Sequence, residues 1–399
     1  MSHLSFIEKL LEGVDVEWKE LGNSINFQRG KRLVKSQLEE SGEYAVFQNS
    51  MTPLGYYHEG NVSAKSAFVI CAGAAGEIGF SDDSFWAADD VYYAEQSEIL
   101  NSKYLYHFLL TQKHKIASQV RRASIPRLSK SAIEKLVVPI PCPNNPEKSL
   151  AIQAEIVRIL DAFTAMTAEL TAELTAELNL RKKQYNYYRD KLLSFEEGDV
   201  EWKTLDEVAL DFGRGKSKHR PRNDPSLYGG DIPFIQTGDI RNAAHTIQEY
   251  SQTYSELGLK QSKLWPKGTL CITIAANIAE TSILGFDACF PDSVIGFVAN
   301  PEETSSSYVE YLLSSIKTQL EEKGQGSAQS NINLGTFQNL KLPFPSITEQ
   351  ERIVTILDKF DTLTSSITEG LPREIELRQK QYEYYRDLLL SFPKSDEAA

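Results

Sequence analysis

The residues that could form a catalytic site are few and poorly spaced. Gly213-Arg-Gly-Lys-Ser217 resembles a phosphate-binding loop, but Leu210 stands where that loop needs its first glycine. Two acid-x-Lys patterns, Asp15/Glu17/Lys19 and Asp199/Glu201/Lys203, resemble those of some nucleases, but no further acid follows at a suitable distance. The six histidines are dispersed, so they build no nucleophilic triad. We therefore expect no catalytic centre in this chain.

Metal and cofactor motifs are likewise missing from the pattern. Cys71, Cys142, Cys271 and Cys289 do not stand at metal-ligand spacing, and we expect them to be reduced and mostly buried. The Gly-rich run 72–76 is not a dinucleotide fingerprint and predicts a tight turn. No Asn/Asp-Pro-Pro-Tyr tetrad is present for methylating an extruded base. The sequence thus predicts neither a metal nor a cofactor on this chain.

Cationic residues gather in three short clusters that could contact DNA phosphates. Two of them begin with an Arg-Gly-Lys motif, which occurs at position 29 and again at position 214. The third precedes a Pro-rich run. The candidates are Arg29, Lys31, Arg32 and Lys35, then Arg121, Arg122 and Arg127, then Arg214, Lys216, Lys218, Arg220 and Arg222. Arg and Lys bind phosphate and guanine, which makes these clusters candidate DNA contacts.

Amides beside these clusters could read base edges. Asn and Gln pair with adenine in the major groove. The candidates are Gln236 and Thr237 after a strand-like run, and Gln329 and Asn331 in a polar, Gly-rich stretch where the second half has no arginine cluster. Gln48 and Asn49 follow a short strand in the first half. Surface amides are commonly only solvated, and that interpretation stays open for each of them.

Composition places the chain among globular proteins of more than one domain. It has 399 residues, 41% hydrophobic and 24% charged, which predicts two or three domains. No apolar run reaches the length of about 20 residues that a membrane helix needs, and the N-terminus has no signal-peptide pattern, so we expect a cytoplasmic protein. The net charge of −13 argues against DNA binding unless the cations are clustered.

The chain is a tandem duplication. Asp15-Val-Glu-Trp-Lys-Glu-Leu21 returns as Asp199-Val-Glu-Trp-Lys-Thr-Leu205, and the run 180–195 returns almost unchanged as 377–392. Each half consists of two modules. The first modules of the two halves are alike only at their edges, whereas the second modules are alike throughout. We predict domains at 1–146 and 197–346, and helical spacers at 147–196 and 347–399. Two readers with different targets on a repeated scaffold explain this pattern, and undirected drift of an old duplication is the alternative.

Periodicity gives the expected elements of each module. Short apolar runs with Gly and Pro punctuation predict strands at 66–71, 76–80, 232–236, 268–274 and 294–298. Amphipathic spacing predicts helices at 103–115 and 308–321. The prolines at 139–143 and 343–345 should stop a strand and begin an extended connection. We therefore expect an α/β fold: two mixed α/β domains in a pseudo-twofold repeat.

Each spacer is predicted to be one long helix, the second bent near Gly370-Leu371-Pro372. Three Thr-Ala-Glu-Leu tetrads place Leu170, Leu174 and Leu178 on one helix face, continued upstream by Phe163 and Met166, with Thr and Glu facing out. Each tetrad adds about 6 Å and about 40° of rotation. The stripe suits packing against the other spacer helix, and the repeat is either a ruler or a neutral slippage product. Packing is also expected of the tyrosines Tyr185, Tyr187, Tyr188, Tyr382 and Tyr385.

This ordered set of duplicated motifs resembles the specificity subunit of type I restriction–modification systems, and the tetrads resemble its IC subgroup. The motifs are Val16-Glu-Trp-Lys-Glu-Leu21, the closings Pro139-Ile-Pro141 and Pro343-Phe-Pro345, and the Ile-Val-x-Ile-Leu-Asp helices from Ile156 and Ile353. The resemblance covers essentially the whole chain. It implies a non-catalytic subunit whose two target recognition domains each read half of a split, asymmetric site in double-stranded DNA, separated by an antiparallel coiled coil.

The resemblance also implies the partners. Two modification subunits carrying S-adenosylmethionine would dock on the helices, and motor-nuclease subunits using ATP and Mg would join them. The tetrad number would set the gap between half-sites, three tetrads giving the longer gap, with targets about one helical turn apart.

Two rival hypotheses are a protein-binding scaffold, which would explain the acidity, and a self-sufficient nuclease, which needs a metal site. The half-site sequences and the gap length do not follow from the sequence.

Overall fold

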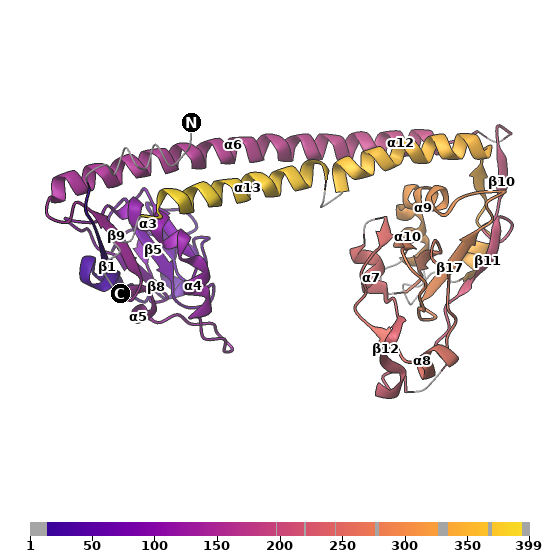
Figure 1. The fold of residues 1–399 in the computed structure, drawn as a ribbon, viewed down its shortest axis with the longest axis horizontal. Helices are drawn as coiled ribbons and strands as arrows, with labels where there is room; N and C mark the ends of the chain where they lie inside the picture. Colours follow the sequence, from indigo (N-terminus) through magenta and orange to yellow (C-terminus); the bar gives the residue numbers. More distant parts are fainter. Residues whose placement is uncertain are drawn as a thin grey trace. The chain divides into compact units, whose positions relative to one another are not determined.

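The computed structural model describes residues 14–196, 198–218, 221–243, 245–275, 279–325, 334–365 and 369–392. The chain divides into two compact units. Unit 1 is Met1–Ala172 with Glu376–Ala399, and unit 2 is Glu173–Ile375. Each unit contains one globular domain and parts of the long helices (Figure 1). The two units are described separately below.

The domain of unit 1 has three sheets. Their orders are β2-β8-β5-β6 with all neighbours antiparallel, β4-β3-β7, and the pair β1-β9. The strands are β1 (Val16–Glu20), β2 (Phe27–Arg29), β3 (Tyr44–Phe47), β4 (Gly55–Tyr57), β5 (Ser66–Ile70), β6 (Ile78–Ser81), β7 (Trp86–Ala87), β8 (Val91–Ala94) and β9 (Val137–Pro141). All five residues of β5 are buried, as expected for a continuous apolar strand inside a sheet.

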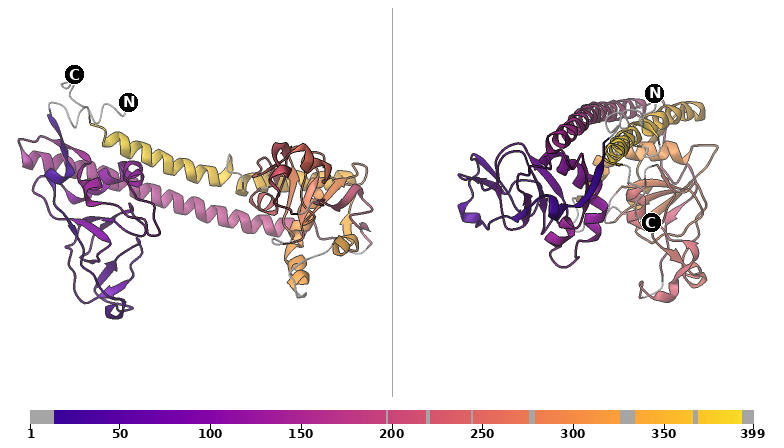
Figure 2. Two further views of the ribbon diagram at one scale, coloured as in Figure 1. Left: turned by 90° about the horizontal axis from the view of Figure 1, so that it is seen from below. Right: turned by 60° about the vertical axis from the view of Figure 1, so that its left-hand side comes forward.

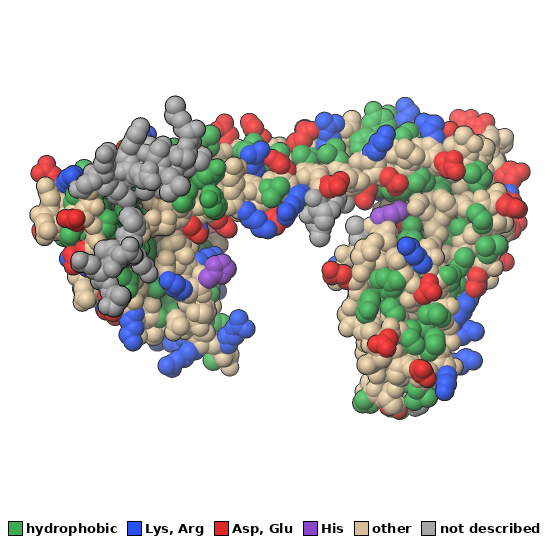
Figure 3. Space-filling model, in the orientation of Figure 1, with side chains coloured by type: hydrophobic (Ala, Val, Ile, Leu, Met, Phe, Trp, Pro, Cys, Tyr) green, Lys and Arg blue, Asp and Glu red, His purple; other side chains and the backbone are tan. Residues whose placement is uncertain are grey.

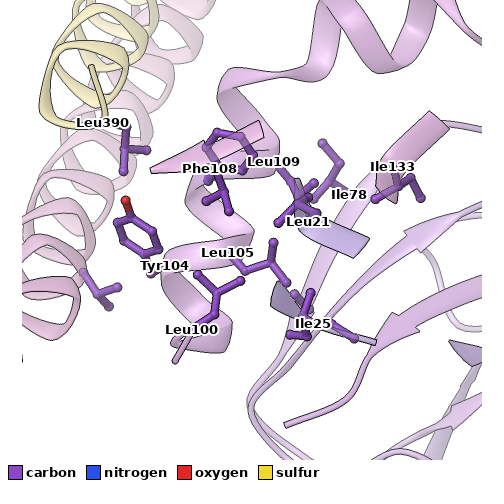
Figure 4. Packing of buried hydrophobic residues seen from close by; sticks show 14 of the residues in the cluster. Leu21, Ile25, Ile78, Leu100, Tyr104, Leu105, Phe108, Leu109, Ile133 and Leu390 are labelled. Atoms are coloured by element: carbon purple, nitrogen blue, oxygen red, sulfur yellow. The ribbon is translucent and has the colours of Figure 1, made fainter. Parts of the chain in front are cut away.

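Helix α3 packs the main sheet of unit 1 against the long helix. The helices of this domain are α2 (Leu21–Ser24), α3 (Ser102–Thr111), α4 (Lys113–Ser118) and α5 (Lys130–Glu134), with a 3-10 turn η1 (Lys35–Gln37). Asn101 caps α3, its side chain accepting from the amides of Lys103 and Tyr104. Figure 4 shows Tyr104, Leu105 and Phe108 of α3 in the core, with Leu390 of the C-terminal segment beside them.

The domain of unit 2 repeats this plan with additions. Its five-stranded sheet has the order β11-β17-β15-β16-β13, beside the pairs β12-β14 and β10-β18. The strands are β10 (Glu201–Lys203), β11 (Ala209–Arg214), β12 (Tyr228–Pro233), β13 (Thr246–Ile247), β14 (Thr253–Tyr254), β15 (Leu270–Thr273), β16 (Thr281–Leu284), β17 (Val294–Ala299) and β18 (Leu342–Phe344). The helices are α7 (Thr237–Asn242), α8 (Glu256–Lys260), α9 (Ser306–Ser315), α10 (Lys317–Gln325) and α11 (Leu334–Gln338), with a 3-10 turn η2 (Pro225–Leu227).

The first spacer is a single helix, α6 (Pro146–Leu192), as predicted. It begins with a proline, which is tolerated in a first helical turn, and has no further Gly or Pro. The second spacer is two helices, α12 (Ile347–Ser365) and α13 (Gly370–Leu389). Two helices thus take the place of the predicted bent helix, and Gly370 starts α13 with a φ of +75°.

Within each unit, α6 runs beside part of the second spacer. In unit 1 it packs against α13, where the Thr164 hydroxyl donates to the Tyr382 hydroxyl oxygen at 2.9 Å and the Phe163 and Tyr385 rings are 6.1 Å apart. In unit 2 it packs against α12, where Tyr188 stacks on Phe360 at 5.8 Å. The two views in Figure 2 show α6 and the yellow helix side by side. The predicted pairing of spacer helices is confirmed within each unit.

Two predicted helices are each interrupted. The run 103–115 is divided at Gln112 between α3 and α4, and the run 308–321 at Ile316 between α9 and α10. The cause is the same in both halves. The Thr111 hydroxyl donates to the Phe108 carbonyl at 2.7 Å, and the Ser315 hydroxyl donates to the Leu312 carbonyl at 2.7 Å. Such side chains compete for backbone hydrogen bonds and favour a helix end.

The proline prediction was wrong in its position. Pro139 and Pro141 lie inside β9, and Pro343 lies inside β18. Among the described residues, β9 pairs with β1 alone. Pro139 and Pro141 are two residues apart, so both direct the position of their missing N–H toward the same unpaired edge. The carbonyl on that edge is not left free, because the buried Tyr104 hydroxyl donates to Pro139 O at 2.9 Å. Tyr308 donates to Pro343 O at 3.0 Å in unit 2.

Candidate nucleic-acid interface

One edge of the main sheet in unit 1 carries the first basic cluster. Strands β2, β8 and β5 are antiparallel neighbours, so the end of β2, the start of β8 and the end of β5 meet at one edge. Arg29 ends β2, and its Nε donates to the carbonyl of Asp89 at 2.6 Å. The other predicted cations of this cluster, Lys31, Arg32 and Lys35, are exposed around the buried Leu33. Figure 3 shows Lys and Arg side chains at the end of this domain away from the helices.

Gly30 explains why the repeated motif is Arg-Gly-Lys. A Cβ atom at this position would be 2.5 Å from the carbonyl carbon of Ala87 and still closer to the carbonyl oxygens of Ala87 and Ala88. The Gly30 amide donates to Val91 O and the Lys31 amide to Ala87 O, both at 2.9 Å. Only glycine permits this close approach. The motif therefore fixes Arg29 and Lys31 against the turn that precedes β8.

The third predicted cluster lies beside the same edge. Arg121 and Arg127 exchange backbone hydrogen bonds of 2.9 and 3.1 Å, which closes a hairpin over residues 122–126. The hairpin is attached to the end of β5, because the Leu128 amide donates to Cys71 O at 2.9 Å. Burial raises the pKa of the Cys71 thiol, and the charges of both Arg29 and Arg127 oppose that rise. Clusters about a hundred residues apart in sequence thus converge on Cys71.

Asn49 joins this edge, as the sequence suggested for an amide after a strand. Its carbonyl accepts from the Ala74 amide at 2.9 Å, and the neighbouring Gly73 amide donates to Pro126 O at 3.2 Å. Gly73 has a φ of +81°, and a Cβ there would meet Asn49. The Gly-rich run is the predicted tight turn, and it connects the loop after β3 with the 121–127 hairpin. We call this assembly of residues 29–35, 48–50, 71–75 and 121–128 the basic edge of unit 1.

Unit 2 builds its second Arg-Gly-Lys motif in the same way. Arg214 ends β11, and the Gly215 amide donates to Val294 O at 2.8 Å. A Cβ at Gly215 would be 2.6 Å from the Phe290 ring and closer still to the carbonyls of Phe290 and Pro291. Lys216 and Lys218 are exposed, and Arg222 forms an ion pair with Asp292 at 2.8 Å. Arg220, Gln329 and Asn331 lie outside the described residues.

Gln236 and Thr237 lie at the start of α7 in unit 2. Gln236 is exposed at the N-cap position, where its backbone amide donates to Asp239 Oδ2 at 2.8 Å. Its side-chain nitrogen donates to the side-chain oxygen of Gln252. Thr237 is half-buried. The side chain of Gln236 is thus oriented by Gln252.

The sequence did not single out Lys263 in this unit. Its ammonium lies 3.5 Å from the centroid of the Trp265 ring and forms an ion pair with Asp211 Oδ2 at 2.5 Å. The Ser262 hydroxyl donates to Lys216 O at 2.8 Å, which brings the Lys263 segment to the second Arg-Gly-Lys motif. Lys260, Lys263 and Lys267 are three lysines within eight residues that contain no acid, and this was the signal available in the sequence.

Each domain is fixed to its own helix by equivalent contacts that sequence reasoning also missed. Gln153 of α6 accepts from the Asn101 amide at 2.8 Å and donates to Ile99 O at 2.9 Å. Gln350 of α12 accepts from the Thr304 hydroxyl at 2.8 Å and donates to Glu303 O at 2.9 Å. The two glutamines occupy equivalent positions of the tandem repeat, and this equivalence was the signal available in the sequence. These contacts orient each domain on a helix that begins with Pro-rich connections.

An aspartate completes this anchor in each unit. Asp161 lies 3.2 Å from the Nε2 atom of the buried His107, and Asp358 accepts from the Tyr311 hydroxyl at 2.7 Å. Burial lowers the pKa of His107, and the hydrogen bond to Asp161 opposes this shift. The acid of the repeated Ile-Leu-Asp motif therefore has one role, holding the domain helix against the spacer, with a different donor in each half.

The spacer residues divide into packed and exposed sets. Leu170, Leu174 and Leu178 are half-buried, but so are Thr167 and Thr171, so the packed face is wider than predicted. Met166 is 65% exposed and does not continue the stripe. The packed tyrosines are Tyr185 and Tyr188 beside Phe360, and Tyr382 and Tyr385 beside Thr164 and Phe163.

Tyr187 does not pack as predicted. It is 61% exposed, and its counterpart Tyr384 is 64% exposed. Each of these rings instead contacts the neighbouring tyrosine edge-on at 5.4 Å. The reason is helical spacing, because adjacent residues face about 100° apart and only one of them can meet the partner helix. The repeated Tyr-Tyr pair thus places one ring inward and one outward in both units.

The acid-x-Lys patterns form ordinary ion pairs. Lys19 pairs with Glu17 at 2.9 Å, and Lys203 pairs with Glu201 at 2.7 Å and Glu303 at 2.6 Å. The second pattern borders an open, acidic hollow of about 670 Å³ in unit 2, beside the β10-β18 pair. Among the described residues, no three His, Cys, Asp or Glu side chains gather as metal ligands. Nor is any described helix long and apolar enough to cross a bilayer.

The comparisons with known proteins agree on one family. A model of the type I restriction modification DNA specificity domain matches residues 13–180 and 197–377. The chain is 40% identical to the specificity subunit of the Escherichia coli type I restriction enzyme EcoR124I/EcoR124II, with 99% of both chains covered. It is 38% identical to a putative type I restriction enzyme specificity subunit of Haemophilus influenzae, with 97% of this chain and 98% of that one covered.

Solved structures share the fold. A structure from a study of the assembly and conformational transition of the type I R-M system has a TM-score of 0.66 at 14% identity, covering 94% of this chain and 97% of that one. The HsdS subunit from Thermoanaerobacter tengcongensis has a TM-score of 0.51 at 15% identity, covering 94% and 95%. With two matched domains and relatives of nearly equal length, the chain belongs to the family of non-catalytic DNA specificity subunits of type I restriction–modification systems.

Proposed function

We propose that each domain, within residues 1–146 and 197–346, reads one half of a split, asymmetric site in double-stranded DNA. One observation carries this proposal: the same glycine-dependent Arg-Gly-Lys edge is built twice, at Gly30 and at Gly215. The loops around the two edges differ, since the first has the 121–127 arginine hairpin and the second has Gln236 and Lys263. Shared cations bind phosphate on any sequence, and the differing side chains select the bases.

The acidic net charge is compatible with this proposal because cations gather locally. The basic edge of unit 1 has no acid between Arg121 and Lys130, and five acids of unit 2 line the hollow beside β10 and β18. A cationic face on an acidic protein still concentrates DNA locally. We expect weak binding by the chain alone, strengthened by basic partner subunits.

We further propose that the helical segments 147–196 and 347–399 set the gap between half-sites. Leu170, Leu174 and Leu178 repeat once per tetrad inside the uninterrupted helix α6. Removing one tetrad shortens that helix by about 6 Å and turns it by about 40°. That step is of the order of the rise and twist of one base pair. We therefore expect the length of the gap to change and the sequences of the two half-sites to stay the same.

The same helices are proposed to bind two copies of a modification subunit. The outward-facing residues Leu180 and Tyr187 of α6 are 61% exposed each, and their counterparts Leu377 and Tyr384 of α13 are 42% and 64% exposed. Exposed aromatic and aliphatic side chains at equal spacing are typical of interface anchors. A surface present twice suits two identical partners. These partners would carry S-adenosylmethionine, and motor-nuclease subunits with ATP and Mg would complete the enzyme in the cytoplasm.

Mapping methylated adenines tests this function. The chain is co-expressed with a modification subunit of its system, and N6-methyladenine is located across the host genome. We expect one motif with two unlike halves and a fixed gap. A variant lacking Thr171–Leu174 should shift the gap alone, whereas substitution of Gln236 should alter one half alone. If the complex forms and no split motif appears, the protein-binding scaffold becomes the better interpretation.

A further inference from the structure

The hairpin of residues 121–127 presents an apolar side chain among unpaired cations. Ile125 is 54% exposed, and Arg121, Arg122 and Arg127 are exposed around it. Within the described residues, none of these three guanidinium groups takes part in an ion pair, and no acid occurs between Arg121 and Lys130. An exposed isoleucine among cations suits a partner that is a polyanion with an apolar interior.

The base of this hairpin is held firmly. The paired backbone hydrogen bonds of Arg121 and Arg127 close it, and the Gly73 amide donates to Pro126 O beside its tip. Leu128, directly after it, is buried at 3% exposure and bonded to Cys71 O. Ile125 is β-branched and followed by proline, which restricts both its χ1 angle and its backbone. The tip can therefore be pressed into a partner without first losing much conformational freedom.

We propose that Ile125 is a wedge that enters between two stacked base pairs from the minor groove, while the flanking arginines bind the phosphates and the groove walls. This rests on the proposed reading of DNA by unit 1. Apolar wedges of this kind unstack one base step and kink the duplex by roughly 20–90°. The arginines supply the attraction, because a narrow minor groove has an enhanced negative potential.

The wedge would also give unit 1 a selectivity that hydrogen bonds do not. Pyrimidine–purine steps are the most easily unstacked, so the half-site read by unit 1 should contain such a step at the position of Ile125. The loop of unit 2 that follows α10 has a different sequence, with no arginine from Gly324 to Asn333. We therefore expect the local distortion in one half of the site only.

Fluorescence of 2-aminopurine tests the wedge. The full chain, without a methyltransferase that would extrude bases, is bound at low ionic strength to duplexes of the mapped site that carry the probe at successive steps. We expect enhanced fluorescence at one step of one half. Ile125→Ala should abolish the enhancement and weaken binding about tenfold, and Ile125→Leu should restore both. Val137→Ala removes a comparably exposed side chain (45%) from β9 and should change neither.

Two outcomes would overturn the wedge and leave the proposed function intact: specific binding without enhanced fluorescence at any step, or enhancement that survives in Ile125→Ala. A third outcome, loss of partner-subunit assembly in Ile125→Ala with unchanged DNA fluorescence, would reassign the tip to a protein interface. Failure of the proposed function itself looks different, because then no split motif and no site-specific binding exist to be measured.

Discussion

Replacing Gly215 by alanine should destabilise unit 2, whereas the same change at Gly213 should not. The new Cβ would lie 2.6 Å from the Phe290 ring, and an ordinary contact is 3.4 Å, so the backbone must shift by about 0.8 Å or more. That shift lengthens the 2.8 Å hydrogen bond from the Gly215 amide to Val294 O to about 3.6 Å, beyond bonding distance. Overpacking costs about 1–3 kcal/mol and the lost hydrogen bond about 1 kcal/mol, together about 2–4 kcal/mol.

Urea unfolding of the full chain measures this effect. Gly213 lies two residues away in β11, and a Cβ there meets nothing within 4 Å, so Gly213→Ala is a matched control that should be neutral or slightly stabilising. Equal midpoints for the two variants would refute the close-approach explanation of the motif. In the methylation map, Gly215→Ala should degrade one half-site, and Gly30→Ala the other, because each glycine fixes the arginine and lysine of its own edge.

Three further predictions follow from the contacts described above. Tyr104→Phe and Tyr308→Phe should each lower the free energy of unfolding by about 1 kcal/mol, and additively, since the carbonyls they leave lie in different units; a coupling above about 0.5 kcal/mol in the double variant would contradict this. His107 of the unit 1 anchor and His245 of unit 2, whose Nδ1 lies 3.2 Å from a Glu310 carboxylate oxygen, should respond oppositely to pH. Burial lowers the pKa of His245, but the hydrogen bond to Glu310 and nearby carboxylates outweigh burial and leave this pKa raised, so its stabilisation is present below the unfolded value of about 6.5 and lost as pH rises through the raised pKa. The lowered pKa of His107 gives stability that is present above about 6.5 and falls as pH drops; unfolding at several pH values with His107→Gln and His245→Gln checks both signs. Finally, Arg121→Ala should reduce the slope of log affinity against log salt by about 0.9 if it contacts one phosphate, and an unchanged slope would remove it from the interface.

The elements of this fold were predictable where one local pattern decides them. Strand β5 is an unbroken apolar run, and α6 has no breaker after Pro146, so both were found from the sequence. The error over the prolines came from contacts distant in sequence. Pro139 remains in a strand because, in the described part of the chain, β9 pairs with β1 alone and Tyr104 satisfies the other edge. Nothing within ten residues of Pro139 indicates that arrangement.

In the candidate site, too, some residues were identified from the local sequence and others were missed. Duplication and charge identified Arg29 and Arg214, which the structure places at equivalent strand ends. The convergence of Arg29 with Arg127 on Cys71 was not predictable, because it depends on the order of strands in the sheet. Lys263 was missed for a related reason: its partners Trp265 and Asp211 matter only once β11 and the segment before β15 are side by side.

The two halves have diverged in a way that separates recognition from assembly. Contacts that attach each domain to its helix are retained in chemistry even where residues change: Asp161 meets a histidine, whereas Asp358 meets a tyrosine hydroxyl. The glycines that fix the basic edges are also retained. The exposed tip of the 121–127 hairpin, by contrast, is bonded to its own base and to the Gly73 turn and not to α6, among the described residues, so it can change without disturbing the anchor. A domain of this design can change its exposed loops while its contacts with the helix stay the same.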